Sequence, residues 1–169
     1  MPQSYVIGLG ANLGDRLETL RSAVRRLEAL GRVLEISRLY ESGPLGPPQP
    51  DYLNAAVLLE STLGPRELLE GLLGIEREHG RQRRERWGPR TLDLDLLYGP
   101  ELVLEEPGLS VPHPELHCRA FALLPLLDVA PLALDPRTGL RYSELLQDLD
   151  QRSVRSLEPN GPGRAEWSE

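Results

Sequence analysis

Residues 4–30, SYVIGLGANLGDRLETLRSAVRRLEAL, contain a strand, a glycine-rich turn and a helix in succession. Apolar residues alternate over 4–9, which predicts a strand with one buried face. Positions 17, 20, 24, 27 and 30 are apolar at spacings of three and four residues, which predicts an amphipathic helix over 15–30. Asp15 is expected to cap the start of this helix, and Gly31 to cap its end.

The pattern continues toward the C-terminus with further strands and helices. Strands are predicted over 33–41, 53–62 and 92–98, and helices from Gly64-Pro65 onward and over 119–129 and 143–149. A loop is predicted over 42–50, and a loop or short extended chain over 107–114. Pro125 is expected to bend or break its helix. The order β-α-β-β-α-β predicts an α+β fold with a ferredoxin-like core, an extended antiparallel sheet and helices packed on it. We expect a single domain over residues 1–157 and a disordered tail over 158–169.

The composition is that of a globular chain with an acidic balance. Of the 169 residues, 40% are hydrophobic and 27% are charged, and the net charge is −7. The absence of an 18-residue apolar run and of an export signal, together with a single cysteine, predicts a cytoplasmic protein without membrane partners. The negative charge disfavours nucleic acid, and we expect a monomer. Every basic residue is arginine, which excludes a lysine Schiff base and a G-K-[ST] phosphate loop.

The segment that points most clearly to chemistry is the strand around residues 92–96, LDLDL. Alternate residues of a strand share a face, so Asp93 and Asp95 should emerge together with Cα atoms roughly 6.5–7 Å apart. A solvated strand face would explain an isolated D-x-D pattern. Here, however, five arginines within residues 81–90 precede the pair. A triphosphate requires both carboxylate-held magnesium and cations on its remaining oxygens, so the pattern favours a magnesium–triphosphate site.

Three other segments carry weaker signals. Tyr52 and Asn54 share a strand face and could hold a flat heterocycle, although an ordinary strand end explains them equally well. The glycines at 8, 10 and 14 are spaced G-x-G-x-x-x-G, one residue longer than the dinucleotide-binding fingerprint. A proline loop instead of a crossover helix joins the second and third strands, which disfavours dinucleotide binding. His113 could contact phosphate or be structural.

Together these segments resemble the 6-hydroxymethyl-7,8-dihydropterin pyrophosphokinase family over about residues 5–149. The matching motifs are RWGPRTLDLD at 86–95, GLGANLG at 8–14, PDYLNA at 50–55 and VPHP at 111–114. The first of these is the most specific to the family. The resemblance implies transfer of pyrophosphate from ATP to the hydroxymethyl group of the pterin, with release of AMP, in folate synthesis.

The resemblance also implies a role for each matching residue. Asp93 and Asp95 would hold two magnesium ions on ATP and form the catalytic set with Arg81 and Arg90. The ATP-binding residues would be Arg81, Arg83, Arg84, Trp87, Arg90, Leu96, His113 and Arg119, and those from 81 to 90 would lie on a mobile loop that closes on the triphosphate. The pterin would be bound by Ser42, Pro44, Leu45, Tyr52, Asn54 and Phe121.

Some residues depart from the family pattern, and two rival functions share some of these features. Gly43, Gly108 and Pro114 stand where the family often has a proline, a basic residue and a tyrosine, respectively. A magnesium-dependent nucleotidyltransferase or phosphohydrolase would also use paired aspartates and arginines, and product analysis separates it. An RNA-binding ferredoxin-like module would need exposed aromatic residues, which a chain with 5% aromatics and one phenylalanine disfavours.

Overall fold

The computed structural model describes residues 1–43, 48–80, 91–157 and 166–168. The strands are β1 (Gln3–Ala11), β2 (Arg32–Ile36), β3 (Tyr40–Ser42), β4 (Tyr52–Ser61), β5 (Asp93–Tyr98), β6 (Leu104–Glu106), β7 (Leu109–Val111) and β8 (Val154–Ser156). The helices are α1 (Arg16–Leu27), α2 (Pro65–Glu78), α3 (Ala120–Val129) and α4 (Tyr142–Gln147), with the 3-10 turns η1 (Leu116–Cys118) and η2 (Glu166–Ser168). Within these ranges, no helix has the length and apolar character needed to cross a membrane.

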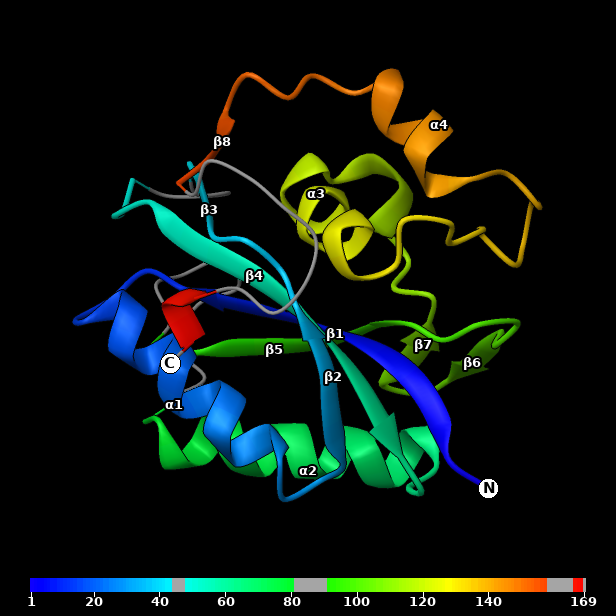
Figure 1. Ribbon diagram of the computed structural model, residues 1–169, viewed down its shortest axis with the longest axis horizontal. Helices are drawn as coiled ribbons and strands as arrows, with labels where there is room; N and C mark the ends of the chain where they lie inside the picture. Colours follow the sequence, from blue (N-terminus) through cyan, green and yellow to red (C-terminus); the bar gives the residue numbers. More distant parts are fainter. Residues whose placement is uncertain (44–47, 81–90, 158–165, 169) are drawn as a thin grey trace.

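A six-stranded antiparallel sheet forms the centre of the molecule (Figure 1). Its strand order is β5-β1-β4-β3-β8, and β2 also pairs with β4. The beginning of β4 pairs with β3 and its end pairs with β2. Strands β6 and β7 form a separate hairpin. The predicted combination of helices with an extended antiparallel sheet is confirmed.

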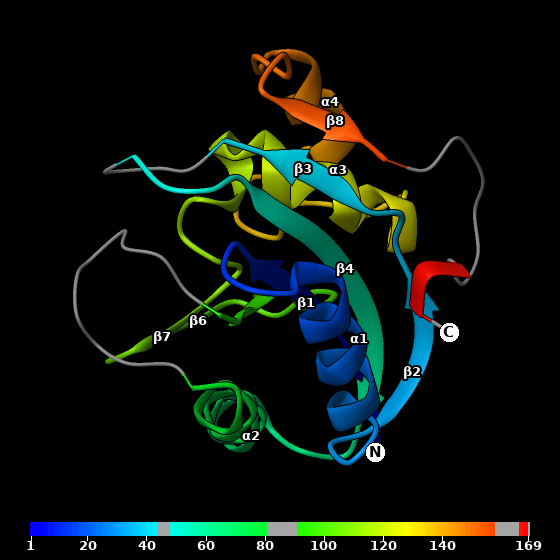
Figure 2. The same ribbon diagram turned by 90° about the vertical axis from the view of Figure 1, so that its left-hand side faces the viewer.

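The two faces of the sheet carry two hydrophobic cores. Helices α1 and α2 cover one face (Figure 2), where they bury Tyr5, Ile7 and Leu9 of β1. Helices α3 and α4 cover the other face, where Val6 is buried. The alternation seen in the sequence therefore separates the two cores, as the period of two along a strand requires. Asp15 caps α1 as predicted, because its Oδ1 accepts the backbone N–H of Glu18 at 3.1 Å.

The strand predicted over residues 33–41 is in fact two strands, β2 and β3. Between them, the hydroxyl of Ser37 accepts the backbone N–H of Ala56 at 2.8 Å and takes the place of a ladder carbonyl. The break also lets Arg38 reach α3, where its guanidinium forms bonds of 3.1 and 2.9 Å to the carboxylate of Asp128. The hydroxyl of Tyr40 donates to the same carboxylate at 2.9 Å. This partly buried polar contact of Arg38 and Tyr40 with α3 has no periodic signature in the sequence.

Two predictions about glycines are wrong. The predicted strand ended at residue 9, before a glycine-rich turn, whereas β1 continues to Ala11, so Gly10 lies inside the strand and not in the turn. Helix α1 ends at Leu27, and Gly31 does not cap it. A Cβ at Gly31 would lie 2.3 Å from the carbonyl oxygen of residue 60, so glycine is needed there because the chain passes directly against β4.

Two further predictions are met only in part. The loop or short extended chain predicted over 107–114 includes β7, but the β6–β7 hairpin of residues 104–111 was not predicted. Helix α3 continues through Pro125, although that residue was expected to bend or break it. Proline removes one helical hydrogen bond at a cost of about 3 kcal/mol. Burial of Leu123, Leu126 and Val129 in the second core offsets this loss.

The C-terminal residues also depart from the prediction. Strand β8, which was not predicted, extends the sheet at β3. Residues 166–168 were expected to be disordered, yet Trp167 is only 6% exposed and belongs to the core beneath α1. Its indole N–H donates to the Ser37 carbonyl at 2.7 Å, and Arg21 donates to the Trp167 carbonyl at 2.6 Å. The rest of the predicted tail, residues 158–165 and 169, lies outside the described residues.

Candidate active site

The floor of the candidate site is a strip of glycine backbone in the middle of the sheet. Gly10 of β1 lies between Asp93 of β5 and Asn54 of β4. Gly8 has Asp95 as its partner on β5. A Cβ at Gly10 would lie 3.6 Å from Asn54 Oδ1, so any larger side chain would occupy the space above the strand. The two glycines keep this face of the sheet open between the functional side chains.

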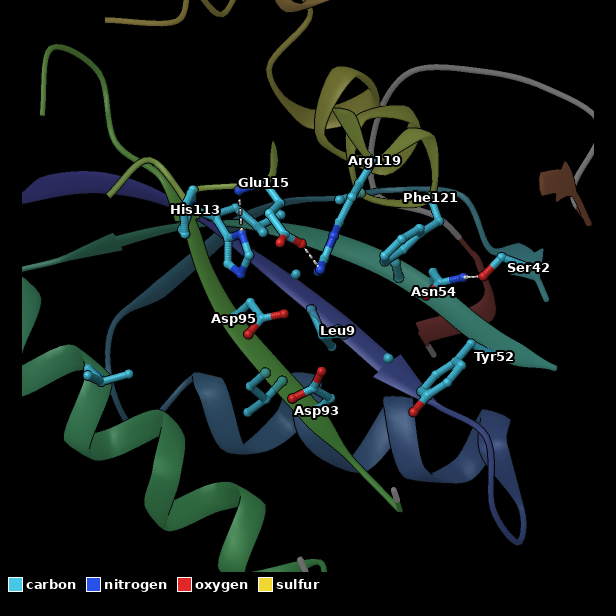
Figure 3. Close-up of a pocket in the computed structure, with 18 of the residues that line it drawn as sticks. Leu9, Ser42, Tyr52, Asn54, Asp93, Asp95, His113, Glu115, Arg119 and Phe121 are labelled. Atoms are coloured by element: carbon cyan, nitrogen blue, oxygen red, sulfur yellow. Dashed lines mark hydrogen bonds and ion pairs between the residues drawn. The ribbon is translucent and has the colours of Figure 1, made fainter. Parts of the chain in front are cut away.

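Above this floor lies a pocket of about 470 Å³ (Figure 3). It is bounded by the sheet, by α2 on one side and by the segment from His113 to the start of α3 on the other. The lining residues are Gly8, Leu9, Gly10, Ser42, Gly43, Tyr52, Asn54, Ala55, Leu69, Leu73, Asp93, Leu94, Asp95, Leu97, His113, Pro114, Glu115, Arg119, Phe121 and Ala122. A pocket of this volume can enclose much of a small organic ligand.

Strand β5 directs its two carboxylates into this pocket. Asp93 and Asp95 line it, whereas Leu92, Leu94 and Leu96 are buried in the core beneath α1 and α2, so the predicted alternation is confirmed (Figure 3). The backbone N–H of Leu94, between the two aspartates, donates to Oε2 of Glu76 on α2 at 2.7 Å. Glu76 is completely buried, which fixes this part of β5 against the helix.

Alternation along β5 also determines which leucine reaches the pocket. Leu97 shares the face of Asp93 and Asp95, and the β-bulge opposite Val6 and Ile7 changes the facing only of Tyr98, which lies in the second core together with Leu97. Leu96 remains in the core beneath α1 and α2, while Leu97 turns to the opposite face and lines the pocket. The predicted contact of Leu96 with adenine is therefore not supported by its side chain, and Leu97 occupies the position facing the cavity.

His113 and Arg119 face the carboxylates from the opposite wall (Figure 3). The Nδ1 of His113 accepts the backbone N–H of Glu115 at 3.2 Å, so the neutral ring carries its proton on Nε2. Burial, reinforced by the nearby Arg119 charge, lowers the pKa of His113, against the opposing effect of Asp93. The ring is therefore a neutral hydrogen-bond donor at pH 7.

Arg119 places a cation at the start of α3. It forms an ion pair with Glu115 one helical turn earlier in the chain. Burial lowers the pKa of Arg119, whereas Asp95 and Asp93 act in the opposite direction, and the guanidinium stays charged at neutral pH. The site thus combines carboxylates on the sheet with a cation and a neutral imidazole above them. Such a combination can neutralise and orient a polyphosphate.

The other end of the pocket is a slot between two aromatic rings. Tyr52 lies at the start of β4, and Phe121 lies in the first turn of α3 (Figure 3). Between them, the side-chain amide of Asn54 donates to the Ser42 hydroxyl at 2.7 Å in a buried position. This bond orients the carboxamide and leaves its oxygen on the side of Gly10. Aromatic faces and an oriented amide suit a flat, hydrogen-bonding heterocycle.

Among the described residues, the structure brings together most of the predicted site. Ser42, Tyr52, Asn54, Asp93, Asp95, His113, Arg119 and Phe121 all line one pocket. The predicted residues Pro44, Leu45, Arg81, Arg83, Arg84, Trp87 and Arg90 lie outside the described residues, and so does most of the expected mobile loop. Sequence reasoning missed the lining residues Leu69, Leu73, Leu97 and Glu115. Leucines stand at 68, 69, 72 and 73 of α2. Leu68 and Leu72 are buried in the core, so the extra width of this stripe is the signal that could have found Leu69 and Leu73.

Comparison with known proteins identifies the class to which this pocket belongs. The chain belongs to the 7,8-dihydro-6-hydroxymethylpterin-pyrophosphokinase (HPPK) family, whose pattern it matches over residues 6–131. It is 45% identical over 157 residues to the 2-amino-4-hydroxy-6-hydroxymethyldihydropteridine pyrophosphokinase of Synechocystis sp., covering 91% of this chain and 80% of the relative. It is 46% identical over 134 residues to the protein of that name from Pseudomonas aeruginosa, covering 78% and 83%.

Solved structures support the fold independently. The chain superimposes on Plasmodium falciparum HPPK-DHPS with a TM-score of 0.71 at 15% sequence identity. The match covers 87% of this chain but only 44% of the Plasmodium chain, so this chain spans less than half of that protein. At such low identity the similarity concerns the fold alone.

Proposed function

We propose that this protein transfers the terminal pyrophosphate of ATP to the hydroxymethyl group of 6-hydroxymethyl-7,8-dihydropterin and releases AMP, a step of folate biosynthesis. Membership of the HPPK family supports the reaction. The observation that carries the proposal for this chain is that one pocket joins an aromatic slot to a pair of carboxylates. These are the two environments that a pterin and a metal-bound triphosphate require.

In this proposal the pterin occupies the slot between Tyr52 and Phe121. The rings would stack on its two faces, and the carboxamide of Asn54 would bond its amide edge. The bond from Asn54 to Ser42 supports this role because it fixes the carboxamide before the ligand binds. A preoriented donor and acceptor reduces the entropy lost on binding.

The triphosphate would lie over the glycine floor, beside Asp93 and Asp95. Magnesium suits this end of the pocket, since it commonly uses one or two protein carboxylates and takes its other ligands from phosphate and water. Within the described residues, no group of three or more acidic, histidine or cysteine side chains could hold a metal by itself. Two carboxylates therefore fit an ion that arrives with the nucleotide. Bound magnesium would supply charge neutralisation on the transferred group.

The chain's own contribution to the step is alignment and charge. The pterin hydroxyl oxygen would form a bond to the β-phosphorus and lose its proton to solvent, while the bond from that phosphorus to the oxygen of the AMP phosphate breaks and AMP leaves with that oxygen. Holding the acceptor in line, roughly 3–3.5 Å from the phosphorus, lowers the barrier by removing translational freedom. Arg119 would neutralise phosphate charge, and His113 would donate its Nε2–H to a phosphate oxygen.

The remaining apolar wall suits the adenine. Leu69 and Leu73 of α2, together with Leu97, line the pocket. Apolar side chains beside the phosphate region would favour transfer of a flat base from water into the pocket.

The topology supports a finer description of the fold. We infer that the central strands form a ferredoxin-like core, since β5-β1-β4-β2 are neighbours in that order and every pair is antiparallel. A single domain over residues 1–157, a monomeric state, a cytoplasmic location and the absence of nucleic-acid and membrane partners stay predictions from the sequence.

Product analysis tests the proposed reaction. The purified protein with magnesium, ATP and the reduced pterin should form one AMP per pterin diphosphate, and none of this AMP should form without the pterin. Stoichiometric ADP would indicate a phosphotransferase or phosphohydrolase. Release of free pyrophosphate would indicate a nucleotidyltransferase. Either result would overturn the proposal.

A further inference from the structure

Two segments of chain lead into the proposed pterin slot. One ends at Ser42, at the end of β3, and the other begins at Tyr52, the first residue of β4. Ser42 and Tyr52 are direct partners in the antiparallel ladder between these strands. The side chains of both residues line the slot, so the position of the two segments determines its shape.

A single side chain outside the pocket contacts both segments. Nη1 of Arg16, the first residue of α1, lies 2.9 Å from Oε2 of Glu41 and donates to the backbone carbonyl of Asp51 at 2.9 Å. Glu41 immediately precedes Ser42, and Asp51 immediately precedes Tyr52. Arg16 does not line the pocket, and its side chain is 31% exposed.

The surrounding contacts make this bridge well defined. The side chain of Glu41 is only 13% exposed and is also paired with Arg155 of β8. Hydrogen bonds from Arg155 and Arg16 lower the pKa of Glu41, so it is anionic at neutral pH. Asn12, four residues before Arg16, donates to the carbonyl of Pro50 at 3.0 Å. Asn12 and Arg16 therefore bind the carbonyls of Pro50 and Asp51, the two residues that precede Tyr52.

We propose that Arg16 is a positioning residue for the pterin, which joins the end of β3 to the start of β4 and so sets the affinity of the slot. The proposal rests on the proposed function for the identity of the ligand. The guanidinium can serve both contacts at once because it presents several donors in a fixed plane. Among the described residues, its effect reaches the pterin through Ser42 and Tyr52.

The sheet predicts that this effect is confined to one end of the pocket. Asp93 and Asp95 lie on β5, which β1 separates from β4. None of the described contacts of Arg16 reaches β5, His113 or Arg119. Loss of the bridge should therefore weaken pterin binding while leaving nucleotide binding and turnover near their original values.

The test compares Arg16→Gln with Arg16→Lys, Glu41→Gln and a control, Arg25→Gln. Arg25 lies on the same helix and forms an exposed ion pair with Glu18. It does not line the pocket. KM for the pterin, KM for ATP and kcat are measured at neutral pH, together with the melting temperature. For Arg16→Gln we expect about a fivefold rise in the pterin KM, the size typical of one partly exposed charged contact.

The other variants sharpen this expectation. Arg16→Lys should fall between wild type and Arg16→Gln, since an ammonium keeps the charge but bridges two acceptors poorly. In Glu41→Gln the pterin KM should rise less, because the bond from Arg16 to Asp51 survives. Arg25→Gln should match wild type. Equal changes in both KM values, or an unchanged pterin KM in Arg16→Gln, would overturn the proposal.

The two proposals fail in distinguishable ways. If wild type forms no AMP from ATP and the pterin, the proposed function itself is wrong. If wild type is active and the pterin KM of Arg16→Gln equals that of wild type, only the positioning role is wrong. Hydrogen exchange at the backbone N–H of residues 52–54, measured without ligand, supplies a second readout. We expect faster exchange there in Arg16→Gln than in Arg25→Gln, and equal exchange would contradict the bridge.

Discussion

Replacing Trp167 with alanine should destabilise the protein strongly, although this residue is the third-last of the sequence. The side chain is only 6% exposed and belongs to the core beneath α1. Truncation of a buried aromatic side chain to alanine costs about 3–5 kcal/mol. Since a domain of this size is stable by roughly 5–15 kcal/mol, Trp167→Ala should remove a large share of the free energy of unfolding.

A second substitution separates the contribution of the indole hydrogen bond to stability from that of the buried ring. Trp167→Phe keeps an aromatic side chain but loses the indole N–H, which donates to the Ser37 carbonyl at 2.7 Å. That carbonyl lies in the break between β2 and β3, and leaving it without this donor costs about 1–3 kcal/mol. The loss of stability should therefore increase from wild type through Trp167→Phe to Trp167→Ala.

Urea unfolding followed by far-UV circular dichroism measures these differences. Leu132→Ala is the matched control, because Leu132 is 74% exposed and should change the free energy of unfolding by less than about 0.5 kcal/mol. A Trp167→Ala protein whose free energy of unfolding lies within about 1 kcal/mol of wild type would refute the docking of residues 166–168 as a part of the core.

Three further predictions concern the pocket. Asp93→Asn and Asp95→Asn should each lower kcat by at least about 100-fold in an AMP assay while circular dichroism stays unchanged, since a carboxylate that neutralises the transferred group is lost; near-normal turnover at saturating magnesium would contradict this role. Tyr52→Ala and Phe121→Ala should weaken pterin binding, measured by calorimetry, more than ATP binding, and an equal loss for both ligands would argue against the slot. The pKa of His113 is lowered in the folded protein, so the unfolded chain binds more protons and His113 contributes stability above about pH 6.5 that is lost as pH falls through its folded pKa. His113→Gln should flatten the fall in melting temperature below pH 6.5, and an identical pH dependence in both proteins would count against a buried neutral ring.

The sequence by itself determined those features that rest on local periodicity and residue chemistry. Alternation along β5 was enough to place Asp93 and Asp95 on one face and Leu94 on the other, because side chains of a strand alternate whatever the strand pairs with. The leucine spacing of α1 and its cap at Asp15 were also predicted from the sequence alone and are confirmed. The motifs also predict the chemistry of the pocket, because they rest on residue types and their spacing.

Only the tertiary structure decided features that depend on how distant segments meet. Gly8 and Gly10 form the floor of the pocket because β1 lies between β4 and β5, a pairing that no local pattern encodes. A bulge places the consecutive residues Leu97 and Tyr98 in the same core, since one extra residue reverses the facing of a strand. Trp167 packs in the core beneath α1 and donates to the carbonyl of Ser37, 130 residues earlier, a contact that only the folded chain can form. Local propensity cannot reveal such contacts, because their free energy comes from long-range packing and hydrogen bonding.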